Sequence, residues 1–421
     1  MINDKKIFFV FPVIILICIG AMIYFTHTEP KTIELYVHDS GKKEVFSYLA
    51  EKFCGEHKNR CRIKVLSARD SKQYLRGRII KDDIPDIIAI DGNALYTQLA
   101  ENGYLLNLGK KKFIGEIHQN YINMIYKING KAGTTIFGIP YAVNASGLIY
   151  NKTIFNTYNL TPPKTWSELM DVCAVLKKAG VPAFGMSFAE SWTCLPAWNN
   201  LVPVLVSDTS FIDNKNAGKT TFLETHREVL EKYAAILEYT QGTEAFSASY
   251  SDAVSGFASG KYAMLINGIW SIPLIKKVNP DAEIDTIPFP SCDEAERNTV
   301  NSGLDAVLMI SKKTKQKRLA EKFIQFLLRP ENSQIYTDRY YSFSTVNGAI
   351  QKNPAFSGLI EIMQEGRISE FPDHYYPPHF FIAKILSDFV YNHERGIPDE
   401  TNITATLMRF DSEYDECVEQ Q

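Results

Sequence analysis

Trp270 stands at a point in the chain where a side chain could bind a ligand as well as pack. The apolar run 262–266 is typical of a buried strand, bounded by Gly260 and Asn267-Gly268. Trp270 follows that turn directly. Open α/β sheets bind ligands at the carboxyl ends of their strands. A flat aromatic ring at such an end suits an apolar ligand face, whereas packing is the alternative because most tryptophans are largely buried.

Residues that could perform covalent chemistry show no recognisable pattern. The sequence contains no GxSxG, HExxH, P-loop or GxGxxG motif, and no pair of carboxylates is set apart by its spacing. Cys54, His57 and Cys61 could contribute to a metal site, but no fourth ligand has a suitable spacing. We therefore predict a protein that is not an enzyme and that holds no metal or cofactor.

The elements that position Trp270 belong to an α/β body. Strands are expected at 32–38, 63–67 and 85–90, and helices at 42–53, 71–81 and 94–102. This alternation predicts mostly parallel sheets flanked by helices. The segment 163–180 is a well-marked helix, capped by Thr165 with Glu168 completing a capping box, and its Trp166 is assigned to packing. A further helix at 316–331 is broken before Pro330.

Residues 1–31 predict export. Lys5 and Lys6 precede a 19-residue uncharged apolar run, 7–25, which at 1.5 Å per residue just crosses a hydrocarbon core of about 30 Å. The paired lysines favour a cytoplasmic N-terminus. We predict an uncleaved signal anchor; a cleaved signal peptide and a lipoprotein lipidated at Cys18 are the alternatives. The body then lies outside the cytoplasm, either anchored to the outer face of the cytoplasmic membrane or periplasmic after cleavage.

Composition and cysteine content agree with that location. The chain has 421 residues, 45% hydrophobic and 22% charged, which is enough for two domains. Its formal net charge is −3, without a basic stripe, so we expect no nucleic-acid partner. An even number of cysteines remains beyond residue 31, which permits disulfides outside the cell. Cys54 and Cys61 flank a short loop where a bridge is feasible.

Six landmarks, in order, resemble the extracellular solute-binding proteins of carbohydrate ABC importers, the family that includes maltose-binding protein. They are "PDIIAIDGNALYTQLAENGYLLNL", "GIPYAVNASGLIYNKTIF", "PKTWSELM", "FASGKYAMLINGIWS", "IPFP" and "LAEKFIQFLLRPE". The resemblance implies the two-lobed periplasmic-binding-protein fold of type II, each lobe a mostly parallel sheet flanked by helices. With the tether and anchor predicted at 1–31, it implies a first lobe at 32–143 and 301–346, and a second at 144–300 and 347–421.

The resemblance also implies a ligand cleft between the lobes, lined by loops that follow strand ends. Its candidate ligand-binding residues are Asp39, Ser40, Asp91, Asn93, Asn144, Glu190, Trp192, Trp270 and, from a looser match, Tyr376 or Phe380.

The chemistry of these residues suits a sugar. Carboxylates and amides bind hydroxyl groups, and tryptophan suits the apolar face of C–H groups. On this ground Trp270 is expected to stack on the sugar. Asp91 and Asn93 keep a second interpretation, as caps of the helix that starts at Ala94. Asn144 stands where maltose-binding protein has a glutamate, so the sugar should differ.

The predicted function is capture of a sugar or oligosaccharide and its delivery to the permease subunits of an ABC importer, by a protein expected to be a monomer. The alternative is a membrane-anchored sugar sensor that signals to a membrane kinase. An iron or anion binder using Tyr340-Tyr341 and an extracellular glycosidase are further readings, the latter without a recognisable pair of acids.

Overall fold

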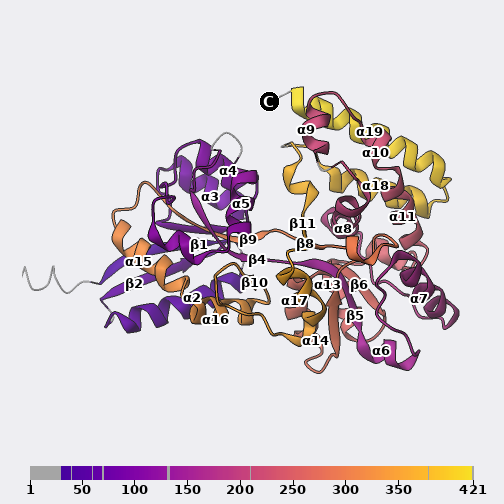
Figure 1. Cartoon of the computed structure of the whole chain (residues 1–421), viewed down its shortest axis with the longest axis horizontal. Coiled ribbons are helices and arrows are strands. Elements are labelled where there is room, and N and C mark those ends of the chain that lie inside the picture. The colour runs from indigo at the N-terminus through magenta and orange to yellow at the C-terminus, as the bar shows by residue number, and fades with distance from the viewer. Residues whose placement is uncertain are drawn as a thin grey trace, which may run out of the picture.

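The computed structural model describes residues 30–38, 40–58, 60–68, 71–129, 133–208, 210–377 and 379–419. They form two α/β lobes, each built on its own sheet, with β4, β8 and β9 in the middle of the view in Figure 1. The predicted anchor at 7–25 lies outside the described residues. Within the described ranges, no helix is both long and apolar enough to span a bilayer.

The first lobe has a sheet with the strand order β10-β4-β9-β3-β1-β2. Its strands are β1 (Lys31–Val37), β2 (Cys61–Leu66), β3 (Ile87–Ile90), β4 (Gly138–Val143), β9 (Leu304–Ile310) and β10 (Phe343–Ser344). Its helices are α2 (Ser40–Glu56), α3 (Ser71–Ile80), α4 (Ala94–Glu101), α5 (Gln119–Ile128), α15 (Lys317–Leu327) and α16 (Pro330–Tyr340), with the short 3₁₀ helix η1 (Lys112–Glu116).

The second lobe has a sheet with the order β11-β8-β5-β6, and β7 also pairs with β5. Its strands are β5 (Ser146–Asn151), β6 (Met264–Gly268), β7 (Ile284–Ile287), β8 (Val300–Ser302) and β11 (Ile368–Glu370). Its helices are α6 (Lys152–Thr157), α7 (Trp166–Lys178), α8 (Leu195–Leu205), α9 (Phe211–Asn216), α10 (Phe222–Thr225), α11 (Arg227–Leu237), α12 (Glu244–Ser247), α13 (Tyr250–Ala258), α14 (Ile272–Val278), α17 (Ser357–Gln364), α18 (Ile382–Glu394) and α19 (Asp399–Glu419). The 3₁₀ helices there are η3 (Ser191–Cys194), η4 (Ile269–Ser271), η5 (Ala295–Arg297), η6 (Pro354–Phe356) and η7 (Pro372–Tyr375).

Both sheets are mixed, so the prediction of mostly parallel sheets is wrong. In the first sheet β1 is parallel to β2 and β3, but β9 is antiparallel to β3 and β4, and β10 to β4. In the second sheet β5 is antiparallel to β6, β7 and β8, and only β11 and β8 pair in parallel. The reason is the path of the chain: β4 leaves the first sheet toward the second lobe, and β9 enters it coming back.

Local signals in the sequence are confirmed where they lie close together. Thr165 caps α7 by accepting a hydrogen bond from the backbone N–H of Glu168, at 3.2 Å. The Glu168 carboxylate accepts from the N–H of Lys164 instead of that of Thr165, so the capping box is displaced by one residue. The helix 316–331 is two helices, because α15 ends at Leu327 and α16 begins at Pro330.

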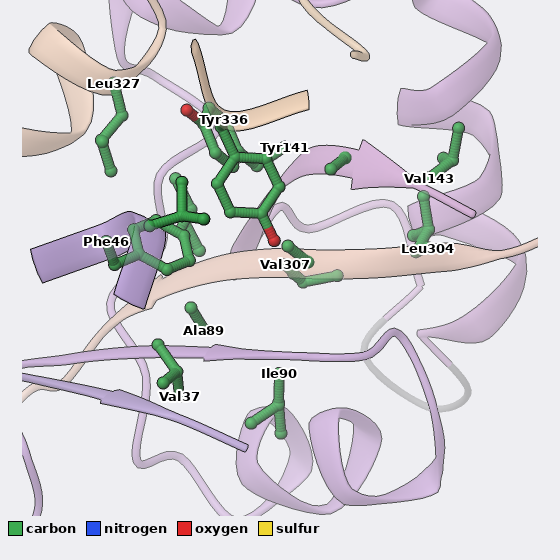
Figure 2. Close-up of a cluster of buried hydrophobic side chains, with 14 of the residues drawn as sticks. Val37, Phe46, Ala89, Ile90, Tyr141, Val143, Leu304, Val307, Leu327 and Tyr336 are labelled. Atoms are coloured by element: carbon green, nitrogen blue, oxygen red, sulfur yellow. The ribbon is translucent and has the colours of Figure 1, made fainter. Parts of the chain in front are cut away.

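The core of the first lobe joins its sheet to α2, α15 and α16. Phe46, Tyr141 and Tyr336 form its centre, with ring centroids 4.9 Å apart for Tyr141 and Tyr336 and 5.0 Å for Phe46 and Tyr336. Figure 2 shows these rings above the strands, with Val307 and Ala89 beneath them. All five residues are fully buried. This packing fixes β4 and β9, the two strands that lead to the second lobe.

Two connections between the sheets are tied to each other. Asn144 and Ala145 join β4 to β5, and Gly303 joins β8 to β9. The N–H of Asn144 donates to the carbonyl of Gly303 at 3.1 Å, and the N–H of Gly303 donates to Oδ1 of Asn144 at 3.0 Å. The hydroxyl of Ser302 donates to the carbonyl of Asn144 at 2.6 Å. These bonds hold the two crossings side by side.

Candidate ligand-binding site

Trp270 lies in η4, immediately after β6, and its indole covers a glycine. A Cβ built on Gly268 would lie 1.9 Å from Cζ3 and 2.1 Å from Cε3 of Trp270. The hydroxyl of Ser271 donates to the carbonyl of Gly268 at 2.8 Å and holds this turn. The side chain is half-buried. The indole therefore rests on backbone rather than inside a packed core.

Phe371 is an aromatic neighbour of Trp270 that the sequence analysis missed. Its ring centroid lies 6.3 Å from that of Trp270 at an interplanar angle of 59°. A Cβ built on Gly303 would lie 2.6 Å from Cδ2 of Phe371, so this ring packs on the crossing between β8 and β9. The only sequence signal is the aromatic-rich stretch 371–381, in which the looser family match points to Tyr376 or Phe380.

A narrow crevice, with an accessible volume of only about 10 Å³, is lined by Phe371 and bordered by both lobes. Its walls include Gly92, Ile128, Gly303, Leu304, Phe371 and His374. Gly303 and Gly92 allow the close approach, because a Cβ on Gly92 would lie 2.8 Å from Leu304 and Ile128. A larger pocket between α5 and α17 is lined by residues such as Tyr121 and Ile360 and by none of the predicted site residues.

Asp91 stands at the crevice, one residue before Gly92, and belongs to a cluster of charged groups. Lys42 in α2 donates to its Oδ1 at 3.1 Å, and Nε2 of His38 lies 3.5 Å from the same oxygen. Lys42 also donates to Oδ1 of Asp305 at 3.0 Å and to the Asp305 carbonyl. The Asp91 side chain is 34% exposed, whereas that of Lys42 is fully buried.

The pKa values of the two carboxyl groups in this cluster, Asp91 and Asp305, shift in opposite directions. Burial raises the pKa of Asp91, but the positive charges of Lys42 and His38 outweigh it and leave that pKa below its ordinary value. For Asp305 burial is the dominant cause, and with the repulsion of Asp91 it raises the pKa despite Lys42. Asp91 is therefore the charged acceptor that faces solvent.

The side chains of Asn93 and Asn144 each accept a hydrogen bond from the protein backbone. Oδ1 of Asn93 accepts from the N–H of Leu95 at 3.0 Å, so Asn93 caps α4, as its second interpretation held. Oδ1 of Asn144 accepts from Gly303, while its Nδ2 donates to no described residue. Asn144 thus lies against the wall of the crevice with one amide group uncommitted.

Glu190 and Trp192 form a separate group in the second lobe. The Glu190 carboxylate accepts from the N–H of Tyr250 at 2.9 Å, which ties η3 to the start of α13. Trp192 is 39% exposed, and its ring lies 5.0 Å from that of Tyr250. Neither residue lines the crevice beside Trp270.

Tyr376 is a core residue, which corrects its assignment as an aromatic wall. It is buried, and its hydroxyl accepts from Nε1 of Trp198 at 3.2 Å. Its ring packs at right angles to those of Phe380 and Tyr414. The alternative candidate, Phe380, is buried in the same cluster. Phe371, rather than Tyr376 or Phe380, is the ring beside Trp270.

Two predicted positions can be described only in part. Ser40 is the first residue of α2, and Asp39 lies outside the described residues.

In the described ranges, no group of three or more His, Cys, Asp or Glu side chains could hold a metal ion. Cys54 and Cys61 are free thiols whose sulfur atoms lie 3.3 Å apart. Burial, together with the neighbouring thiol of Cys54, raises the pKa of Cys61 to about 12.

The family of the chain follows from comparison with known sequences. The family profile described as "Bacterial extracellular solute-binding protein" matches residues 49–363. The chain belongs to this family. Multiple sugar-binding protein of Streptococcus mutans is 28% identical over 359 residues, covering 83% of this chain and 84% of that protein. The melibiose/raffinose/stachyose-binding protein MelE of Bacillus subtilis is 21% identical, covering 84% and 83%.

Solved structures share the fold over nearly the whole chain. The solute-binding protein RafE in complex with raffinose superposes with a TM-score of 0.75 at 21% identity, covering 90% of this chain and 99% of that one. A binding protein MsmE of Bacillus subtilis in an open conformation gives a TM-score of 0.75 at 20% identity, covering 93% and 99%. The two-lobed solute-binding fold is therefore shown.

Proposed function

We propose that this protein binds a neutral sugar or oligosaccharide between its lobes and delivers it to the permease of an ABC importer. The observation that carries the proposal is the crevice at Gly303. Gly92, the neighbour of the charged Asp91, lines it from the first lobe, and Phe371, whose ring centroid lies 6.3 Å from that of Trp270, lines it from the second. Relatives that are named as sugar-binding proteins support the proposal.

The chemistry of the crevice matches the two kinds of surface on a sugar. Oδ1 of Asp91 is held by Lys42, and Oδ2 makes no hydrogen bond with a described residue, so it can accept from hydroxyl groups. The exposed face of Trp270 offers a flat apolar surface for C–H groups. The Nδ2 of Asn144, which donates to no described residue, adds a donor at the crossing beside Gly303.

The charge of the crevice favours a neutral ligand over a phosphorylated one. Relatives named as sn-glycerol-3-phosphate-binding proteins match 51% of the chain at 26% identity. Phosphate groups are usually held by arginine or lysine, yet no residue of either type lines the described crevice. Lys42 is buried and engaged by Asp91 and Asp305, and Lys127 is paired with Glu370, which lines the crevice. The glycerol phosphate function is therefore not carried over.

Delivery requires lobes that move against each other, and we propose the division 32–143 with 301–346 and 144–300 with 347–421 for the moving units. Only short segments, among them Asn144-Ala145 and Gly303, cross between the sheets. Family membership further supports a body outside the cytoplasm, with residues 7–25 as the proposed anchor. The sensor alternative has no support among the relatives, so we propose uptake.

The test is a calorimetric titration of the soluble body with melibiose, raffinose, stachyose and sn-glycerol 3-phosphate. We expect a neutral sugar to bind and the phosphate not to bind. Trp270→Ala should then weaken binding about thirtyfold, because truncating an aromatic anchor costs at least about 2 kcal/mol.

Trp166→Ala is the matched control. Trp166 packs against the second-lobe core under the ammonium of Lys232, 5.0 Å from its ring. Its loss should lower the melting temperature and leave affinity unchanged. The proposal fails if no neutral sugar binds, or if Trp270→Ala binds normally while melting much earlier.

A further inference from the structure

Lys42 is buried at a position where the sequence would place an exposed lysine. It lies in the first turn of α2, where the helix dipole disfavours positive charge, and its side chain has no solvent exposure. Lysines are almost never fully buried unless they are paired. Such an arrangement persists only if its partners compensate for lost hydration.

Two carboxylates, those of Asp91 and Asp305, compensate for the lost hydration of Lys42 by accepting hydrogen bonds from its ammonium. It donates to Oδ1 of Asp91 at 3.1 Å, to Oδ1 of Asp305 at 3.0 Å and to the Asp305 carbonyl. Its ammonium also lies 5.3 Å from the ring centroid of Tyr340 in α16. Helix α2 and strand β9 and the loop before α4 are thus joined by one cation.

We propose that Lys42 is a positioning residue, which holds Oδ1 of Asp91, keeps that carboxylate charged and leaves Oδ2 for a ligand hydroxyl. This inference rests on the proposed function and names a residue behind the site rather than in it. Asp91 touches the ligand; Lys42, fully buried, acts through it.

Asp305 makes the role of Lys42 necessary rather than incidental. Asp305 is almost fully buried, and its Oδ2 has no hydrogen-bond partner in the described structure. Without Lys42, two carboxyl groups would share a site with no fixed positive charge between them. Like charges at this range disfavour double ionisation, so the pair would retain a proton near neutral pH. Asp91 would then lose its charge for part of the time.

Among the described residues, two histidines also face Asp91. His38 follows β1 and lies 3.5 Å from Oδ1 of Asp91, and His374 in η7 acts on Asp91 through its charge. Both are present in the wild type and in every variant below, but the ammonium of Lys42 lies 3.4 Å from Nε2 of His38, so its removal also changes the surroundings of that histidine. The carboxyl signal of Asp91 itself therefore provides the direct readout.

The experiment compares the wild type with Lys42→Met, in which the side chain keeps nearly the same length but loses its positive charge. Affinity for the best-bound neutral sugar is measured by calorimetry from pH 5.5 to pH 8. For Lys42→Met we expect at least tenfold weaker binding at pH 7 and a further loss, approaching tenfold per pH unit, on acidification. The wild type should show no such additional slope.

Lys42→Met with Asp305→Asn is the rescue variant. Removing the second carboxylate lets Asp91 ionise again, so the steep pH profile should disappear and part of the affinity should return. A Lys42 that only supports the fold would instead lower affinity equally at all pH values, without rescue. That result would overturn the proposal, as would a folded Lys42→Met protein with the wild-type profile.

A ligand-free measurement separates this inference from the proposed function. Carboxyl carbon NMR on wild type, Lys42→Met and the double variant reports the pKa of Asp91 directly. We expect it below the ordinary value in the wild type, raised in Lys42→Met and lowered again in the double variant. If no sugar binds, the proposed function fails, while an unchanged Asp91 pKa rejects the inference by itself. If Lys42→Met does not fold, the double variant is compared with Asp305→Asn, which differs from it only at Lys42; a higher Asp91 pKa in the double variant supports the inference, and equal pKa values reject it.

Discussion

Gly268→Ala tests the assignment of Trp270 sharply, because it moves the indole without deleting it. The built Cβ lies 1.9 Å from Cζ3 of Trp270, whereas ordinary contacts between carbon atoms are about 3.5–4.0 Å. The ring must therefore move by about 1.5–2 Å. The backbone itself tolerates alanine, since the φ of Gly268 is −101°, which any residue adopts.

The expected effect falls on binding rather than on folding. A displaced ring loses the contact that makes an aromatic anchor worth at least about 2 kcal/mol, so binding should weaken about tenfold to thirtyfold. Unfolding free energy should change by less than about 1 kcal/mol, because the half-buried indole can turn toward solvent. Calorimetric titration with the best-bound sugar, paired with a thermal melt, measures both quantities.

Gly256→Ala provides a matched control with the opposite expectation. A Cβ on Gly256 in α13 would lie 2.4 Å from Cε2 of Tyr262, which is buried. Overpacking a core costs about 1–3 kcal/mol, partly offset by about 1 kcal/mol of helix propensity. We expect lower stability and unchanged affinity. Wild-type affinity in a folded Gly268→Ala protein would refute the assignment of Trp270 as a ligand contact.

Two further predictions concern acid stability and lobe motion. Burial lowers the pKa of His226 from 6.5 to about 3, so only the unfolded chain takes up its proton between those pH values. Stability should fall by about 1.4 kcal/mol per pH unit in that window. Urea melts should show about 2 kcal/mol lost from pH 6.5 to pH 5 in wild type but not in His226→Phe. X-ray scattering should show a smaller radius of gyration with saturating sugar than without it, and equal radii would argue against closure.

Much of the fold could be predicted because its signals are local. The cap at Thr165 and the break at Pro330 each depend on residues a few positions apart, and the structure has both. Strands β1 and β2 also lie within two residues of their expected ranges. Strand direction could not be predicted in this way, because β9 pairs with β3 and β4 only after the chain has visited the other lobe.

The site was predicted less completely for the same physical reason. Trp270 and Gly268 are neighbours in sequence, and the turn that places them is visible there. Lys42 is separated by 49 residues from Asp91 and by 263 from Asp305, so nothing near it in the sequence distinguishes it from a surface lysine. Phe371 was missed because its place depends on packing over Gly303, which no local pattern records.

The division of chemistry between the lobes explains why binding and closure belong together in the proposed function. The first lobe contributes the charged carboxylate of Asp91, fixed from behind by Lys42, and the second contributes the rings of Trp270 and Phe371. A sugar that contacts one lobe alone leaves either its hydroxyls or its apolar face in water. Only a closed arrangement satisfies both surfaces, so the differential affinity for that arrangement is what shifts the lobes. Loss of charge at Asp91 should therefore weaken closure as well as binding, although Asp91 lies on only one side of the crevice.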